Sequence, residues 1–413
     1  MPKSAILGDQ ELASLTSYFQ PGGYSKDRAL ALVAAGSIAM VTEPGDRMAG
    51  ALARILGRLE LVELMIDGLE TKSVVSALKM AGELESCRQI FGDLENTLAD
   101  SRQRWLPRLS KSRLEHLFTQ SAALKLKLLT PEQDHWPIGL DDLQDSAPAM
   151  VFVEGDSKVL GTLKDAVSIV GSRAASPYGL QVTKRLVTEL AQVSRATVSG
   201  GAIGIDAQVH STSLEQGLTT VAVMAGGMDR KYPQANFPLF KKIQERGALI
   251  SELPPGVAPT RWRFLQRNRL IAALTPTTVV IEAGIRSGSI RTANNALELD
   301  RELLAVPGSI LSSTSLGANW LIADSKALPL CDLSQFATGN EEMTNTRFES
   351  ALAKRAHDAI RELGYPTDTQ IAKVAGLTNS ELKLALTELV ATNLVIQDRS
   401  SLGMVHYALK YAY

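Results

Sequence analysis

The stretch that decides the fold is AVSIVGSRAASPYGLQVTKRLVTELAQVSRATVSGGAIGID, residues 166–206. Two short β-branched runs, at 166–171 and 196–200, each end in glycine, and a segment of helical periodicity separates them. A strand, a glycine turn and a helix in this order are typical of a parallel sheet covered by helices. Ligands of such sheets bind at the carboxyl ends of the strands.

The same unit recurs along the chain, so we expect one α/β domain over residues 129–331 with a parallel sheet and helices on both faces. Short helical periods follow most of its apolar runs. The predicted strands are AMVFVEG (149–155), AVSIVG (166–171), ATVSG (196–200), TTVAVMAGG (219–227), ALISEL (248–253), TTVVIEAG (277–284) and ELLAVPG (302–308).

The segments on either side differ in pattern from this α/β domain. In residues 1–128 the apolar positions recur at three- and four-residue spacing, which predicts an N-terminal helical domain. Residues 332–346 are polar and acidic without a basic residue, which is typical of a linker. Residues 347–413 contain three short helical patterns and two strand-like pieces, the order of a winged helix-turn-helix.

Composition excludes several classes of protein. Of the 413 residues, 45% are hydrophobic and 21% charged, as in globular proteins, and Cys87 and Cys331 lie too far apart for a zinc or disulfide motif. We expect no signal peptide in the first residues, and the longest apolar run, residues 30–41, is too short to span a bilayer. We expect a cytoplasmic protein without a membrane segment.

Charge is distributed unevenly. Residues 166–330 contain 17 Lys and Arg against 11 Asp and Glu, although the chain as a whole has a net charge of −1. This excess favours phosphate-bearing ligands, and an ordinary solvated face is the alternative. Residues 346–413 hold 8 basic and 7 acidic residues, and their expected recognition helix begins near Asn379. So little positive charge favours a protein-contact or regulatory role over reading of base pairs.

Two glycine-rich turns follow the strands of the opening stretch. Gly171, Ser172 and Arg173 combine a closely approachable backbone, a hydroxyl donor and a guanidinium suited to phosphate oxygens. Residues 199–204, SGGAIG, place three glycines before a helix, where free amide groups suit an anion. No lysine follows them, so this turn is not a P-loop.

Three later segments combine donors with aromatic or positive groups. Tyr232 and Asn236 suit stacking on a base and hydrogen bonding to one, and residues 261–269 interleave four arginines with two aromatic residues. In residues 282–293 a strand ends in a glycine-serine turn that precedes a basic helix start. These segments predict the binding of a phosphate backbone with splayed bases.

The same loops lack a nucleophile, paired carboxylates and a metal cluster. Asp206 and His210 lie four residues apart on one helix, where we expect a structural pair. An enzyme acting on nucleotides remains an alternative, with Glu282 as the nearby carboxylate. A transcription factor that uses the winged helix, with the α/β domain as its ligand sensor, is a further alternative.

In this order the segments closely resemble the DNA-processing protein A family, DprA, also called Smf. The resemblance runs from Trp136-Pro137 to Asn319-Trp320-Leu321-Ile322. Between them it rests on the Gly-Ser-Arg turn, Ser-Gly-Gly-Ala-x-Gly-Ile-Asp with His210, Gly227-x-Asp229 with Tyr232-Pro233 and Asn236, Ser251-Glu252-x-Pro254, Arg267-Asn268-Arg269, Ser287-Gly288-Ser289 with Thr292-Ala293, and Ala305-Val306-Pro307-Gly308.

The resemblance implies an extended Rossmann-like domain that binds and protects single-stranded DNA and helps to load the RecA recombinase in natural transformation and recombination. It further implies a homodimer formed through that domain, without catalysis or a cofactor. Where some members have a lysine, this chain has Phe237, and Lys241 or Lys242 could substitute. The expected DNA-binding residues are Gly171, Ser172, Arg173, Ser199, Gly200, Gly201, Gly204, Tyr232, Asn236, Lys241, Lys242, Arg263, Arg267, Asn268, Arg269, Ser287, Gly288, Ser289 and Thr292.

Overall fold

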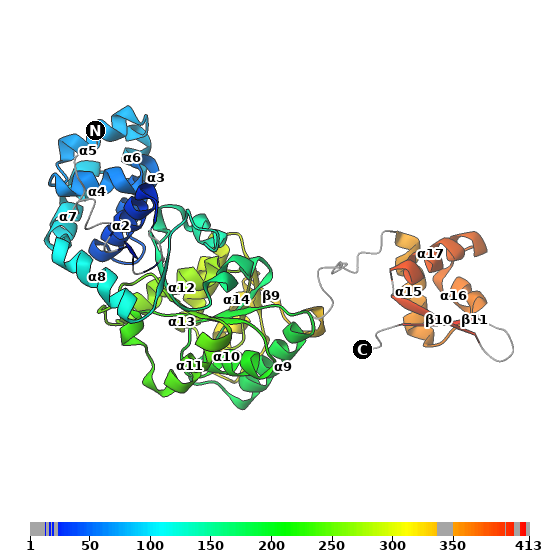
Figure 1. The fold of residues 1–413 in the computed structure, drawn as a ribbon. Coiled ribbons are helices and arrows are strands. Elements are labelled where there is room, and N and C mark those ends of the chain that lie inside the picture. Colours follow the sequence, from blue (N-terminus) through cyan, green and yellow to red (C-terminus); the bar gives the residue numbers. More distant parts are fainter. Residues whose placement is uncertain are drawn as a thin grey trace. The chain divides into compact units, whose positions relative to one another are not determined.

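In a computed structural model of the chain, the apolar runs form strands and the glycine-rich turns form the loops that follow them. The structure describes residues 24–336, 350–392, 394–399 and 405–409, together with Ala13, Thr16, Ser17 and Phe19. The chain divides into two compact units, residues 1–337 and 338–413. Figure 1 shows the helices and strands of each unit.

The first unit is built on a nine-stranded sheet with the order β1-β2-β6-β5-β4-β3-β7-β8-β9. Neighbouring strands pair in parallel along the part of this order that runs from β6 to β9. The strands are β1 (Lys127–Leu129), β2 (Val151–Gly155), β3 (Val167–Val170), β4 (Thr197–Ser199), β5 (Thr220–Val223), β6 (Ala248–Ser251), β7 (Thr277–Val280), β8 (Glu302–Ala305) and β9 (Leu328–Pro329).

The prediction of a wholly parallel sheet is wrong at one edge. Strand β2 pairs antiparallel with β6, with Phe152 opposite Ser251, and β1 pairs antiparallel with β2. An apolar run carries no information about strand direction, so the sequence pattern could not distinguish this edge from the parallel strands. The short edge strands β1 and β9 were not predicted.

The order of the strands reverses at β3. From β3 the chain continues outward through β4, β5 and β6 on one side, then returns to β7 and β8 on the other side. Loops that leave neighbouring strands in opposite directions open a crevice at such a switch point. The crevice here lies between the loops after β3 and β7.

Helices cover both faces of the sheet. In β3 the side chain of Ile169 belongs to the same buried cluster as Leu186 of the α9 helix, and Val170 belongs to the cluster that contains Leu270 of the α12 helix. Successive strand residues point to opposite faces, which accounts for this alternation. The helices of this part are α9 (Pro177–Gln192), α10 (Ile205–Glu215), α11 (Phe237–Arg246), α12 (Arg261–Ala273), α13 (Gly288–Glu298) and α14 (Leu316–Ala323).

The predicted N-terminal helical region is confirmed, and Figure 1 shows its helices, blue to cyan, grouped beside the sheet. Leu32 and Phe118 of these helices share one buried core with Phe152, Phe240 and Leu249. The helical region and the sheet are therefore packed together, and residue 128 lies inside β1. The helices are α2 (Lys26–Val41), α3 (Arg47–Leu56), α4 (Arg58–Ile66), α5 (Thr71–Met80), α6 (Leu84–Phe91), α7 (Leu94–Trp105) and α8 (Lys111–Ala123).

The start of the predicted linker belongs to the first unit. Phe336 is buried against the core under α9, and the guanidinium of Arg195 lies 5.5 Å from its ring centroid. Because the segment is polar and acidic, its composition did not indicate that Phe336 is buried. Residues 337–346, the rest of the predicted linker, lie outside the described residues.

The second unit has the order of a winged helix, as predicted. It comprises α15 (Ala351–Leu363), α16 (Asp368–Ala375), α17 (Asn379–Ala391) and a hairpin of β10 (Val395–Arg399) with β11 (Val405–Leu409). The acidic residues of α17 make structural contacts: Glu381 completes the capping box with Thr378, and Glu388 accepts from the Ser350 hydroxyl at 2.6 Å. No helix in the described parts of either unit is long and apolar enough to cross a membrane.

Candidate nucleic-acid interface

A cleft of about 630 Å³ lies at the carboxyl ends of β3 and β7, at the switch point of the sheet. Its walls come from the loop after β3, the first turns of α12, and the loop that leads into α13. Of the predicted residues it brings together Gly171, Ser172, Arg173, Tyr232, Arg267, Asn268, Ser287, Gly288, Ser289 and Thr292.

Three arginines line the cleft with their side chains exposed: Arg173, Arg261 and Arg286. None of them forms an ion pair with a carboxylate in the described part of the chain. Their charges are therefore available to a ligand, and a guanidinium contacts phosphate oxygens through two parallel hydrogen bonds.

Two aromatic rings lie beside these cations. The rings of Tyr232 and Phe264 meet edge to face with centroids 5.6 Å apart, and Tyr232 is half exposed. The guanidinium of Arg173 lies 5.2 Å from the Phe264 centroid. An exposed ring next to a free guanidinium provides a surface on which a nucleobase stacks while its phosphate is neutralised.

The start of α13 lines the cleft with Ser287, Gly288 and Ser289. Ser287 caps this helix by accepting from the Ser289 amide, and the Ser289 hydroxyl donates to the carbonyl oxygen of Gly171 at 2.8 Å. This bond joins the loop after β3 to the helix after β7. The first turn of a helix carries partial positive charge, which favours an anion.

The glycines of the two turns serve mainly to pack the turns against each other. A Cβ on Gly171 would lie 2.5 Å from the Ile205 side chain, and one on Gly204, whose φ is +83°, would lie 2.3 Å from the carbonyl oxygen of Ser172. A larger residue at either position would separate the turn at 199–204 from the turn at 171–173. Gly200, Gly201 and Gly204 do not line the cleft.

Arg267 is buried beneath the cleft. Its Nη1 donates to the carbonyl oxygens of Gly200, at 2.6 Å, and Val223. Burial lowers the pKa of Arg267 to about 10, an effect that the Asp206 carboxylate opposes. Burial also raises the pKa of Asp206, against the effect of Arg267. Arg267 therefore stays positive at neutral pH. Hydrogen bonds to carbonyl oxygens and the charge of Asp206 compensate its positive charge.

The other predicted arginines of α12 face away from the cleft. Arg269 forms a buried double contact with Glu252, with both nitrogen–oxygen distances 2.6 Å. Arg263 donates to both carboxylate oxygens of Glu43 in the loop after α2. Their side chains join α12 to other parts of the protein. A DNA contact by either arginine stays a prediction, and the contacts seen here do not support it.

Further predicted residues also lie outside the cleft. The buried Ser199 hydroxyl donates to the Ile169 carbonyl oxygen at 2.7 Å, and the Asn236 amide donates to the Gly201 carbonyl oxygen at 2.9 Å. Lys241 and Lys242 are exposed on α11, and Lys242 lines a separate groove with Gln208 of α10. The structure thus leaves the substitution of Lys241 or Lys242 for the family lysine as a prediction.

The groups considered for catalysis already have partners, and among them Asp206 lines the cleft and accepts from the Ala202 amide. The expected pairing of Asp206 with His210 is wrong, because the Nδ1 atom of His210 lies 2.8 Å from the Thr220 hydroxyl in the core. Glu282 is buried outside the cleft lining and accepts from the amide and the hydroxyl of Ser176 at the start of α9. No cluster of three His, Cys, Asp or Glu residues suited to a metal ion occurs among residues that the structure describes.

The list of expected DNA-binding residues omits Arg261, Phe264 and Arg286 of this cleft, although they lie in segments 261–269 and 282–293, which are predicted to bind a phosphate backbone. A signal for the first two was present, because residues 261, 264 and 268 recur at the spacing of one helix face. That face lines the cleft, whereas residues 263 and 269 lie on the side of the helix that packs against other elements. Arg286 lies in a loop, where no such periodicity exists.

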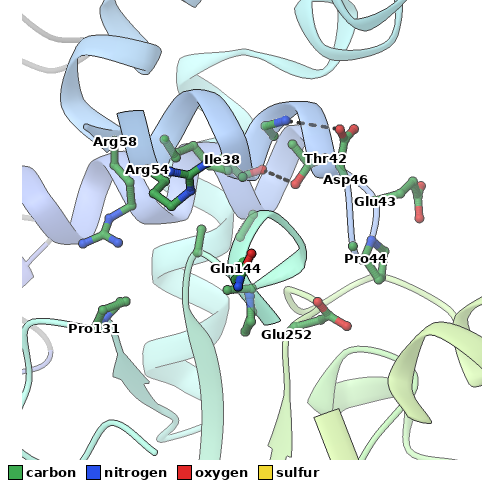
Figure 2. A pocket seen from close by; sticks show the side chains of 18 of the residues that line it. Ile38, Thr42, Glu43, Pro44, Asp46, Arg54, Arg58, Pro131, Gln144 and Glu252 are labelled. Carbon is green, nitrogen blue, oxygen red and sulfur yellow. Dashed lines mark hydrogen bonds between the residues drawn. The ribbon is translucent and has the colours of Figure 1, made fainter. Parts of the chain in front are cut away.

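A second hollow, of about 290 Å³, lies between the N-terminal helices and the sheet. Figure 2 shows Arg54 and Arg58 on one side of it and Glu43 with Glu252 on the other. Every charged side chain that lines this hollow already has a partner. The contacts are Arg54 with Asp145, Arg58 with Glu132, Glu43 with Arg263, Glu252 with Arg269, Asp46 with the Trp105 indole and Asp141 with the Trp136 indole.

A family model and curated relatives match the part of the chain that contains the cleft. A family model described as DNA recombination-mediator protein A matches residues 127–339. A DprA-type DNA processing protein of Mycobacterium tuberculosis is 35% identical over 276 residues, which cover 62% of this chain and 71% of the relative. The DNA processing protein DprA of Bacillus subtilis is 37% identical over 187 residues, which cover 45% of this chain and 62% of the relative.

A solved structure shares the fold of this chain. The X-ray structure of DNA processing protein A from Streptococcus pneumoniae superimposes with a TM-score of 0.57 and 27% identity, covering 75% of this chain and 96% of that one. The family model spans the cleft with all of the turns that build it. The chain belongs to the DNA recombination-mediator protein A family.

Proposed function

We propose that the cleft at the switch point binds single-stranded DNA without strong preference for its sequence. The observation that carries this proposal is the set of exposed, unpaired arginines, Arg173, Arg261 and Arg286, around the ring pair of Tyr232 and Phe264. Arginines neutralise the phosphates, which are the same in every sequence, and aromatic rings stack on any base.

A single strand suits this cleft better than a duplex. The rings of Tyr232 and Phe264 act on the faces of bases, and in a duplex these faces are covered by neighbouring base pairs. A phosphate-bearing mononucleotide could use the same donors, but hydrolysis would need a catalytic carboxylate. The carboxylate that lines the cleft, Asp206, is buried and accepts from the Ala202 amide, and Glu282 is buried and accepts hydrogen bonds from Ser176.

Family membership supports the wider role. The family is described as a recombination mediator, and its curated relatives are named DNA processing proteins. We propose that this chain protects single-stranded DNA, helps to load RecA onto it in the cytoplasm, and serves natural transformation and recombination. We also propose a homodimer through the first unit, and these activities are not catalytic.

Binding is tested by fluorescence anisotropy with labelled oligonucleotides of several sequences, each offered as a single strand and as its duplex. We expect similar affinities for all single strands and much weaker binding to duplexes. A preference for the duplexes, or for one sequence, would contradict the proposal. Hydrolysis of mononucleotides by the purified protein would favour the enzymatic alternative.

The mediator role needs a separate test. RecA ATP hydrolysis is followed on single strands that have been covered with a single-strand-binding protein, with and without this chain. Earlier onset of hydrolysis in its presence is the expected result. Normal binding to single strands without any effect on the onset would leave the binding proposal in place and contradict the loading proposal.

A further inference from the structure

We propose that a bound strand continues from the cleft into a second nucleotide-binding groove on the far side of α12. This inference rests on the proposed single-strand binding and extends it to a site built around Trp262. The groove has a volume of about 490 Å³ and lies between α12, α13 and residues 142–146. Its occupant would be the part of the strand that extends beyond the cleft.

The two hollows share a wall. On α12, Phe264 and Asn268 line the cleft, Trp262 and Gln266 line the groove, and Leu265 lines both. On α13, residue 292 lines the cleft and residue 291 lines the groove. A strand that crosses Leu265 therefore passes from one hollow directly into the other.

The groove offers unpaired positive charge. Arg47 and Arg291 line it with exposed side chains, and neither pairs with a carboxylate among the residues described. Its other arginine, Arg269, is neutralised by Glu252, and its Asp142 is neutralised by Arg301. One exposed carboxylate, that of Glu298, remains, so the free groups leave the groove with an excess of positive charge.

Trp262 supplies the stacking surface. Its side chain is 57% exposed, although tryptophan is a residue whose burial stabilises a fold strongly. The indole stands on the first turn of α12, one residue from Arg261 of the cleft. An exposed indole beside free guanidinium groups is the arrangement by which single-strand-binding proteins hold successive bases.

Asn295 gives an independent indication of a ligand. Its side chain lines the groove, is only 5% exposed, and its Nδ2 atom has no hydrogen-bond partner among the described residues. A buried donor without a partner is unfavourable, because it has lost its bonds to water. A base carbonyl or a phosphate oxygen that enters the groove would satisfy this amide.

The inference is tested with two oligothymidines, of about 5 and about 15 nucleotides, which span the range of single-strand site sizes. Trp105 and Trp136 are buried and Trp320 is exposed, so the Trp320→Phe variant leaves Trp262 as the exposed indole. In this variant we expect the long oligonucleotide to quench tryptophan emission and the short one to leave it nearly unchanged.

Substitutions give the second readout. Trp262→Ala should weaken binding of the long oligonucleotide about tenfold and leave the short one within about twofold, because base stacking accounts for this order of affinity. Arg291→Gln should act in the same direction. Arg185, exposed on α9 and outside both hollows, provides the control variant Arg185→Gln, which should change neither affinity.

The outcomes separate the two claims. If the wild-type protein binds neither oligonucleotide, the proposed function fails and this inference fails with it. If both oligonucleotides bind equally well, with Trp262 emission unchanged and Trp262→Ala without effect, the strand does not enter the groove. The cleft would then remain the complete binding site.

Discussion

Arg263 donates to both carboxylate oxygens of Glu43, through Nε at 3.1 Å and Nη2 at 3.0 Å, and so joins α12 to the loop after α2. Glu43 also accepts from Arg108 at 3.2 Å, and Arg263 donates to the Ala258 carbonyl oxygen just before α12. The helix that carries Arg261 and Phe264 into the cleft is thus held by the N-terminal helices. These helices form part of the structural support for the candidate site.

A double-mutant cycle measures this link. We expect Glu43→Gln and Arg263→Gln to lower the free energy of unfolding by less in combination than the sum of their separate effects. The pair is partly exposed to solvent, which reduces its strength, so a coupling of about 1 kcal/mol is expected from urea unfolding. Additive effects would mean that the contact contributes nothing measurable.

The contact between Arg269 and Glu252 should matter more for stability. Both side chains are 8% exposed, so Arg269→Ala leaves a carboxylate buried without its partner. We expect a loss of about 3–5 kcal/mol in the free energy of unfolding. Arg173→Ala, which removes an exposed arginine of the cleft, is the control and should change stability by no more than about 0.5 kcal/mol. Equal losses would contradict the division of the arginines into structural and ligand-binding groups.

That division shows where sequence reasoning reached its limit. The run at 166–171, the Gly-Ser-Arg turn and the winged-helix order could be predicted, because each depends on a local pattern of apolar residues and glycines. The roles of the four arginines in 261–269 could not, since their partners include Glu43, 220 residues away from Arg263. The antiparallel pairing of β2 with β6 likewise joins segments far apart in the sequence.

Acid should destabilise the first unit through His210. Burial lowers the pKa of this side chain from 6.5 to about 3, with the charge of Arg267 acting in the same direction. Between these values the unfolded chain binds a proton at His210 that the folded protein does not bind. Stability is therefore lost as the pH falls below about 6.5, by about 1.4 kcal/mol for each pH unit.

The variant His210→Gln has no side chain at this position that takes up a proton in this pH range. We expect urea unfolding to show that its stability, measured relative to the wild-type protein, improves by about 2 kcal/mol between pH 7.5 and pH 5. A constant difference between the two proteins over this range would mean that His210 takes up its proton equally in the folded and the unfolded states.

The second unit should be dispensable for binding the single strand. All residues that line the cleft belong to the first compact unit, and the expected recognition helix α17 uses Glu381 and Glu388 in its own capping and packing. A protein ending at residue 345 should bind single-stranded oligonucleotides within about twofold of the full chain in anisotropy titrations. A loss of tenfold or more would show that the winged helix contributes DNA contacts.

The most direct test of the cleft is the salt dependence of single-strand binding in the triple variant Arg173→Gln, Arg261→Gln and Arg286→Gln. Each phosphate contact contributes about 0.7 to the slope of log affinity against log salt, so three lost contacts should flatten the slope by about two units. The triple variant Lys164→Gln, Lys184→Gln and Arg185→Gln removes the same charge from exposed positions outside the cleft and should keep the wild-type slope. Equal slopes in the two variants would contradict the assignment of the cleft as the DNA-binding site.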